Sequence, residues 1–148
     1  MARARAGAVA SRLFLDAVQA ADLMSPNPVS LNADALVSEA IAVMTQRGFS
    51  AAPVIDEAGR PVGVLSRSDL LVHERELFQS PAPAGGGPAR VRDIMTPAIF
   101  SVPLHLPADR VVEQMLTLDV HQLYVVDGSQ SLVGVVTAHD VLRRLRPE

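Results

Sequence analysis

A serine or threonine followed three residues later by an aspartate occurs twice, each time after an apolar run that contains a glycine. The motif is Gly-x-x-Ser-x-x-Asp at Gly63–Asp69 and Gly-x-x-Thr-x-x-Asp at Gly134–Asp140. This pattern is typical of a capping box, which starts a helix and contributes about 1 kcal/mol. It also suits a ligand, because a helix N-terminus favours a phosphate and an aspartate can accept hydrogen bonds from both hydroxyls of a ribose. A hydroxyl residue plus an aspartate therefore fits a nucleoside phosphate better than a bare phosphate.

The residues beside the two motifs differ. Arg67 follows the first hydroxyl residue and can pair with a phosphate, whereas Ala138 at the matching position cannot. His139 could partly replace that charge. Gly63 and Gly134 let backbone come close with no side chain in the way. These residue types predict a polyphosphate at the first motif and a narrower or empty site at the second.

The two motifs belong to a longer internal repeat with an offset of 134 − 63 = 71 residues. Aligned without a gap, residues 22–71 and 93–142 share twelve identities, including the Met-Ser-Pro and Met-Thr-Pro that begin the copies at Met24 and Met95. A gapless repeat of this length indicates two copies of one structural unit. Units of about fifty residues are marginal alone, so we expect the copies to share one core.

Hydrophobic periodicity and turn residues predict a β-α-β-β-α order in each copy. We expect a mixed α/β (α+β) fold in which an amphipathic helix over residues 8–21 precedes the repeats. A Pro- and Gly-rich linker without large apolar residues, expected to be flexible, separates them. The predicted divisions are an N-terminal helical extension (1–21), a first repeat (22–79), the linker (80–90) and a second repeat (91–148). The predicted first strands are 29–31 and 99–102, and the predicted last helix is 138–145.

Composition argues against several functions. The net charge is −3 and there is no tryptophan, so neither a basic face nor an aromatic platform for nucleic acid is expected. There is no cysteine, and the four histidines lack ligand spacing, so we predict no metal site. No apolar run is long enough to span a membrane, and we expect a cytoplasmic protein. Frequent use of Ala, Arg, Pro and Val suggests a bacterial source. Neither motif pairs its hydroxyl with a histidine in both copies, so we expect no enzyme.

Residues 22–145 resemble a tandem pair of CBS (cystathionine-β-synthase) domains, also called a Bateman module. The resemblance rests on the repeat starts at Met24 and Met95, on residues 53–56 and 124–127, and above all on the doubled motif. It implies a pseudo-two-fold axis relating the repeats, with two clefts that bind AMP, ADP, ATP or S-adenosylmethionine. It places nucleotide contacts at Pro28, Val29, Ala51, Ala52, Pro53, Ser66, Arg67, Asp69, Ile99, Phe100, His121, Gln122, Thr137, His139 and Asp140.

The resemblance further implies a homodimer and a regulatory role, in which the ligand state is transmitted to a partner protein. The main alternative is a dimerisation or scaffold module whose Ser66 and Thr137 serve only as helix caps. A regulatory fragment of a longer enzyme or transporter is a third possibility. The residues do not identify the ligand, the partner or the number of occupied clefts.

Overall fold

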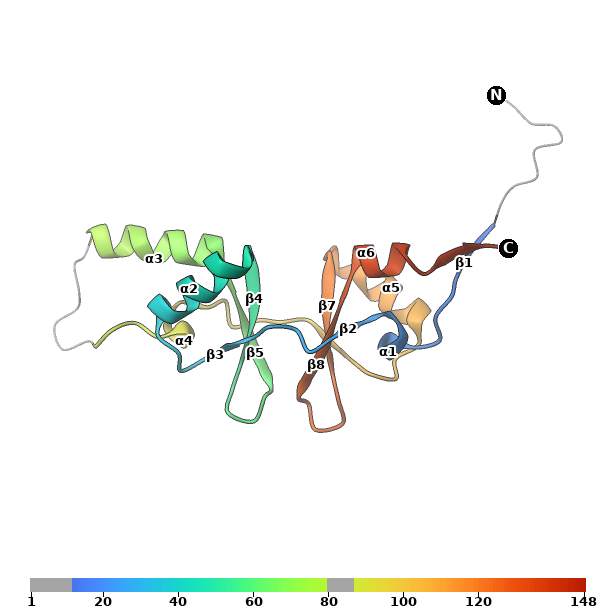
Figure 1. Ribbon diagram of the computed structural model, residues 1–148, viewed down its shortest axis with the longest axis horizontal. Coiled ribbons are helices and arrows are strands. Elements are labelled where there is room, and N and C mark those ends of the chain that lie inside the picture. Colours follow the sequence, from blue (N-terminus) through green and yellow to red (C-terminus); the bar gives the residue numbers. More distant parts are fainter. Residues whose placement is uncertain (1–11, 80–86) are drawn as a thin grey trace, which may run out of the picture.

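The computed structural model describes residues 12–79 and 87–148, which form short strands and helices in a repeated order (Figure 1). The elements are β1 (Leu13–Leu15), α1 (Ala20–Leu23), β2 (Ser25–Pro26), β3 (Leu31–Asn32), α2 (Val37–Arg47), β4 (Ala51–Ile55), β5 (Pro61–Ser66), α3 (Arg67–Gln79), α4 (Val91–Ile94), β6 (Ser101–Pro103), α5 (Ala108–Leu118), β7 (Gln122–Val126), β8 (Leu132–Thr137), α6 (Ala138–Leu142) and β9 (Leu145–Pro147). Most of the predicted linker and residues 8–11 of the predicted N-terminal helix lie outside the described residues.

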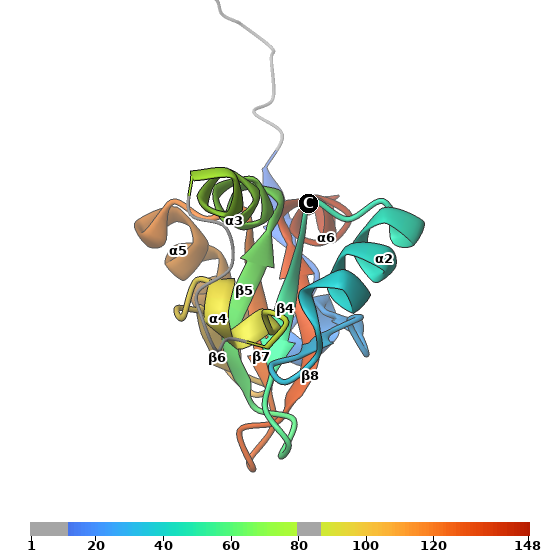
Figure 2. The same cartoon turned by 90° about the vertical axis from the view of Figure 1, so that its left-hand side faces the viewer.

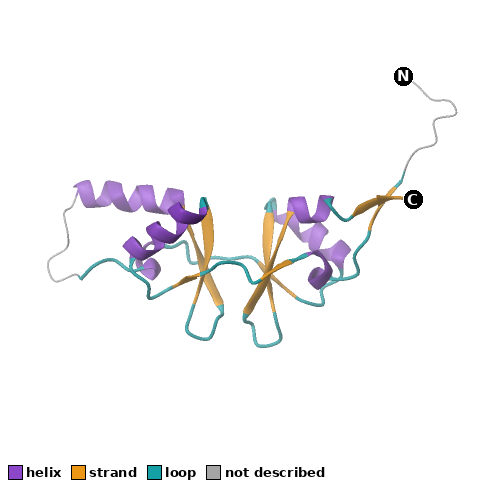
Figure 3. Cartoon of the chain, viewed as in Figure 1, coloured by secondary structure: helices purple, strands orange, loops and turns teal. Residues whose placement is uncertain are grey.

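Each repeat builds a small sheet with helices against it, which confirms the predicted fold class. In the first repeat β3 runs parallel to β4, and β4 pairs antiparallel with β5. In the second repeat β6, β7 and β8 are arranged in the same way. Figure 3 shows the strands of both repeats at the centre of the molecule. In the view of Figure 2, α3 and α6 lie above the strands, with α2 and α5 at the flanks. The first strands begin two residues later than predicted, at Leu31 and Ser101.

The second element of each repeat ends in a left-handed residue. Gly48 closes α2 with φ 68°, as its glycine predicts. Asp119 occupies the equivalent position after α5 and has φ 55°. Aspartate is one of the few other residues that adopt this conformation readily. The chain therefore turns sharply into β4 and β7 at matching places, which aligns the two hairpins.

Each repeat receives a short segment from the other one. The β2 strand, which precedes the first repeat's own sheet, pairs antiparallel with β8. In the same way Thr96 pairs with Val64 of β5, and two backbone hydrogen bonds of 2.9 Å join them. We call residues 24–30 and 95–100 the crossing segments. After leaving the partner repeat's strand, each continues into the first strand of its own sheet (Figure 1).

The expectation of one shared core is wrong, because the buried side chains form two clusters. One contains Leu65, Val54 and Met44 of the first repeat together with Val91 of α4. The other belongs to the second repeat and is completed by Ala20 and Leu23 of α1. Each cluster thus buries residues that precede the other repeat in sequence. The repeats are joined by this exchange of segments rather than by one continuous core.

The predicted helix over residues 8–21 is wrong over residues 12–19, and only Ala20 and Ala21 at its end are helical, in α1. Leu13–Leu15 form a strand that pairs antiparallel with Leu145–Pro147. Three adjacent apolar residues fit a strand as well as a helix, so periodicity alone could not decide. The same pairing ends α6 at Leu142, three residues before its predicted end. The Arg144 guanidinium holds the junction by donating to the carbonyl oxygens of Asp16 and Asp22, at 3.2 and 2.7 Å.

Gly63 makes room for a crossing segment, and not for a ligand as the sequence analysis proposed. A β-carbon at Gly63 would lie 2.5 Å from the Thr96 carbonyl oxygen and 2.8 Å from the Met95 Sδ atom. At Gly134 the neighbour is the Met24 side chain, whose Cγ atom would be 2.9 Å away. Both glycines are therefore required where a crossing segment pairs with β5 or β8.

We predict that Gly63→Ala destabilises the protein by about 1–3 kcal/mol, as overpacking does elsewhere. The reason is that the Thr96 carbonyl is backbone, held by its hydrogen bond to Val64, and has little freedom to retreat. Gly128→Ala is the matched control, because a methyl group added there would have no neighbour within 4 Å. Urea unfolding of both variants measures the difference. Equal losses of unfolding free energy in the two variants would contradict the prediction.

Candidate functional site

The first motif lies where β5 ends and α3 begins. Ser66 is the last residue of the strand, and Asp69 lies in the first turn of the 13-residue helix. The Ser66 N–H and hydroxyl donate to Asp69 Oδ2 at 2.9 and 3.0 Å. In return the Asp69 N–H donates to Ser66 Oγ at 3.2 Å. This reciprocal pair is the predicted capping box.

The second motif has the same geometry at the junction of β8 and α6. The Thr137 N–H and hydroxyl donate to Asp140 Oδ2 at 2.8 and 2.9 Å. The Asp140 N–H donates to Thr137 Oγ1 at 3.2 Å. The capping interpretation is therefore confirmed in both copies. It uses one carboxylate oxygen, Oδ2, of each aspartate.

The second carboxylate oxygens have different partners in the two copies. Asp69 Oδ1 accepts a hydrogen bond of 3.1 Å from the Thr96 hydroxyl, which belongs to a crossing segment. Asp140 Oδ1 accepts one of 2.7 Å from Arg143 Nη2, which belongs to the same helix end. Asp69 is partly buried, whereas the Asp140 residue is only 5% exposed.

Arg143 is the residue at this site that the sequence analysis missed. A signal for it was present, because an acid and a base three residues apart on a helix are neighbours. Burial by itself would raise the pKa of Asp140. Hydrogen bonds from the Thr137 N–H and hydroxyl and from Arg143, with the charge of Arg143, outweigh burial, so the pKa lies below its ordinary value. Asp140 is therefore a charged, fully bonded carboxylate at neutral pH.

The predicted residues at the starts of β4 and β7 lie beside the motifs. The strand register puts Ala51 opposite Ser66 and Gln122 opposite Thr137. Ala52 and Pro53 follow Ala51 into the sheet and are buried. The His121 carbonyl accepts a 2.9 Å hydrogen bond from the Ala138 N–H.

The other predicted base-side residues lie on the crossing segments. Pro28 and Val29 follow the contact of β2 with β8, so they leave from the strand that ends at the second motif. Ile99 and Phe100 follow Thr96, which is hydrogen-bonded to Asp69. The segment that leads into one repeat therefore starts beside the motif of the other. Each candidate site combines parts of both repeats.

The carbonyl groups of the crossing segments differ between copies. The Phe100 carbonyl accepts a 3.1 Å hydrogen bond from the Tyr124 N–H. Pro53 replaces Tyr124 at the equivalent position and has no N–H to donate to Val29. The two predicted phosphate-side residues are both exposed: Arg67 directly follows Ser66, and His139 lies two residues after Thr137.

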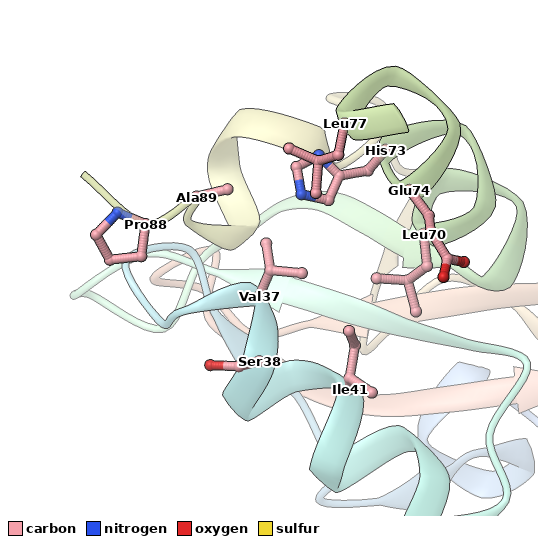
Figure 4. Close-up of a pocket in the computed structure, with 9 residues that line it drawn as sticks. All are labelled: Val37, Ser38, Ile41, Leu70, His73, Glu74, Leu77, Pro88 and Ala89. Atoms are coloured by element: carbon pink, nitrogen blue, oxygen red, sulfur yellow. The ribbon is translucent and has the colours of Figure 1, made fainter. Parts of the chain in front are cut away.

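A separate apolar groove of about 580 Å³ lies between α2, α3 and residues 88–89 (Figure 4). None of the predicted nucleotide contacts lines it. Its walls include Ile41, Leu70 and Leu77, with the polar groups of His73 and Glu74 at the helix α3 side.

Among residues 12–79 and 87–148, no cluster of three or more His, Asp or Glu residues could hold a metal ion. The described helices are all too short or too polar to cross a membrane.

Comparison with known proteins identifies relatives over most of the chain. The chain is 32% identical over 107 residues to the 5′-AMP-activated protein kinase subunit gamma-3 of Bos taurus, covering 72% of this chain and 22% of that protein. It is 32% identical to the magnesium transporter MgtE of Thermus thermophilus, covering 88% of this chain and 27% of the transporter. The chain thus spans only about a fifth to a quarter of these relatives.

Solved structures show the same fold. CBSX2 in complex with AMP superposes with a TM-score of 0.70 and 27% identity, covering 86% of this chain and 95% of that one. The cytosolic domain of the Mg²⁺ channel MgtE in complex with ATP has a TM-score of 0.68 and 30% identity, covering 87% and 49%. The family model described as "CBS domain" matches residues 20–76 and again residues 91–147. Both copies include the capped motif and the segment that crosses to the other repeat, and the chain belongs to the CBS-domain family.

Proposed function

We propose that this chain is a regulatory module that binds an adenine nucleotide or S-adenosylmethionine and transmits its ligand state to a partner protein. The observation that carries the proposal is the doubled capping box, which uses one carboxylate oxygen of each aspartate and leaves the other for side-chain partners. Solved relatives support the ligand class, since CBSX2 binds AMP and the MgtE cytosolic domain binds ATP.

The Asp69 site offers a group for each part of a nucleotide. Asp69 Oδ1 would accept from the ribose hydroxyls, replacing the hydroxyl of Thr96 that it binds in this structure. The first-turn N–H groups of α3, the Ser66 hydroxyl and the exposed Arg67 guanidinium would face the phosphates. Residues Ile99 and Phe100 would lie against the base. These assignments make Ser66 both a helix cap and a ligand contact.

Signal transmission follows from the crossing segments. A ligand on Asp69 that also contacts residues 96–100 would touch both repeats, because this segment starts on β5 and continues into β6. Binding would then favour one relative arrangement of the repeats, and a partner that distinguishes the arrangements would sense the ligand. In the described residues Ser66 and Thr137 hydroxyls bond to aspartates rather than to a histidine, which supports a regulatory role over catalysis.

We further propose a homodimer formed through the helices. Equivalent leucines on α3 and α6, Leu71 and Leu142, are 65% and 63% exposed, and Phe78 is 88% exposed. Leu116 of α5 adds another exposed apolar side chain. Exposed apolar groups that gather on helices at one side of a small protein indicate an interface. We also propose a cytoplasmic location, because adenine nucleotides are abundant there.

A thermal-shift panel of AMP, ADP, ATP and S-adenosylmethionine tests the ligand. A ligand that binds only the native state at 100 times its Kd stabilises the fold by about 2.7 kcal/mol, so the unfolding midpoint should rise. We expect Asp69→Asn to abolish this rise, because an amide cannot replace both accepting oxygens. Asp109→Asn is the control, since Asp109 also lies in the first turn of a helix, α5, and is outside the site.

Two results would contradict the ligand proposal. One is an unchanged midpoint with every compound, and the other is an equal rise in the wild-type protein and in Asp69→Asn. Either result would favour the scaffold alternative, in which the motifs only cap α3 and α6. In that case Asp69→Asn should lower the midpoint of the ligand-free protein, because the capping box loses its carboxylate.

Sedimentation velocity tests the dimer. We expect the wild-type chain of 15.7 kDa to sediment as a dimer, and the double variant Leu71→Glu, Leu142→Glu to sediment as a monomer, because charges on an apolar interface must be desolvated. Ser129→Glu adds a charge in an exposed hairpin turn and should remain dimeric. A monomeric wild-type protein, or a dimeric double variant, would disprove this interface.

A further inference from the structure

The two motifs are equivalent in sequence but differ in which group holds the second carboxylate oxygen. Thr96 donates a neutral hydroxyl to Asp69 Oδ1 at 3.1 Å. Arg143 donates a charged guanidinium N–H to Asp140 Oδ1 at 2.7 Å. The residue equivalent to Arg143 in the first repeat is Val72, because the offset is again 71. Ser25 is the equivalent of Thr96 and also carries a hydroxyl, so the charged donor is what the second copy has and the first lacks.

The donors differ in how easily a ligand can replace them. Both bonds go to an ionised carboxylate, but the guanidinium adds the attraction between opposite charges, which the neutral Thr96 hydroxyl lacks. A ribose hydroxyl that displaces Thr96 exchanges one neutral donor for another. A ribose hydroxyl that displaces Arg143 must exchange a charged donor for a neutral one at a carboxylate that is 5% exposed. The same ligand group therefore binds Asp69 more easily than Asp140.

The backbone of Arg143 is held in place, although its side chain is 62% exposed. Arg143 directly follows the last residue of α6, and its N–H donates to the His139 carbonyl at 3.0 Å. Its own carbonyl accepts from Arg146 Nη1 at 2.7 Å. The next residue, Arg144, is tied to the carbonyl oxygens of Asp16 and Asp22. The backbone that presents Arg143 to Asp140 is thus fixed by the end of the chain and by the segment before the first repeat.

We propose that Arg143 determines which motif accepts a nucleotide: it occupies the Asp140 carboxylate, so that one nucleotide binds per chain, at Asp69. This inference rests on the proposed function and refines it, because it assigns unequal roles to two motifs that look alike. Asp140 then serves mainly to anchor α6. The proposal also identifies position 72 as the place where the same block could be introduced into the first repeat.

The test exchanges the two residues between the copies and measures AMP binding to the full chain by isothermal titration calorimetry. The wild-type protein should bind one AMP per chain. Val72→Arg should weaken that binding about tenfold or more, because it supplies Asp69 with a charged donor. Arg143→Val should add a second binding event. The matched controls are Val72→Met, which has a long side chain without a charge, and Arg110→Val, which removes an arginine of α5 whose side chain is as exposed as that of Arg143.

The outcomes separate this inference from the proposed function. If the wild-type protein binds AMP but Val72→Arg binds it equally well, or if the wild-type protein already binds two, the role of Arg143 is disproved and the nucleotide function stands. If AMP, ADP, ATP and S-adenosylmethionine all fail to bind, both proposals fall. Weaker binding in Arg143→Val would mean that Arg143 helps to hold the ligand, which also overturns the inference. Val72→Arg keeps the test decisive even where Arg143→Val unfolds, since position 72 is an exposed surface position.

Discussion

The structure depends on backbone hydrogen bonds between each crossing segment and the strand that leads into the motif of the other repeat, β5 or β8. Thr96 and Val64 exchange two such bonds, and β2 forms the matching ladder on β8. These bonds form only because Gly63 and Gly134 carry no β-carbon. This pairing places α4 in the buried cluster of the first repeat and α1 in that of the second, where Val91 and Ala20 are fully buried. A unit of about fifty residues thus completes its core with residues from its neighbour.

The same exchange determines the composition of the candidate sites. A hydroxyl residue and an aspartate come from one repeat, whereas the segment beside them leads into the other. Thr96 shows the consequence most directly, because its backbone is paired with Val64 and its hydroxyl is bonded to Asp69. A group that replaces the Thr96 hydroxyl acts on a residue that also joins the repeats. The position of the site at the junction is the reason why the proposed function couples ligand binding to the arrangement of the repeats.

Local sequence patterns predicted the elements of each repeat well, but they did not predict which distant segments pair with one another. The capping boxes, the left-handed Gly48 and both hairpins depend on residues close in sequence, so motif and spacing were sufficient. The strand at Leu13–Leu15 depends on Leu145–Pro147, more than 120 residues away, and three apolar residues carry no information about that partner. The single shared core failed for the same reason. Arg143 was missed because the motif was defined by residues that the two copies share, and the equivalent of Arg143 in the first copy is Val72.

Asp69 and Asp140 have different hydrogen-bond partners because each needs a donor for its second carboxylate oxygen. A capping box satisfies one oxygen, and a buried carboxylate needs a donor for the other as well. Asp69 obtains it from the crossing segment, so its bonding reports on how the two repeats are joined. Asp140 obtains it from its own helix end, next to an arginine that ties the last residues to the segment before the first repeat. Either donor stabilises the fold, but only the neutral one can be exchanged for a ligand hydroxyl at little cost. Both motifs cap a helix, and under the proposal the donor to the second oxygen decides which of them accepts a nucleotide.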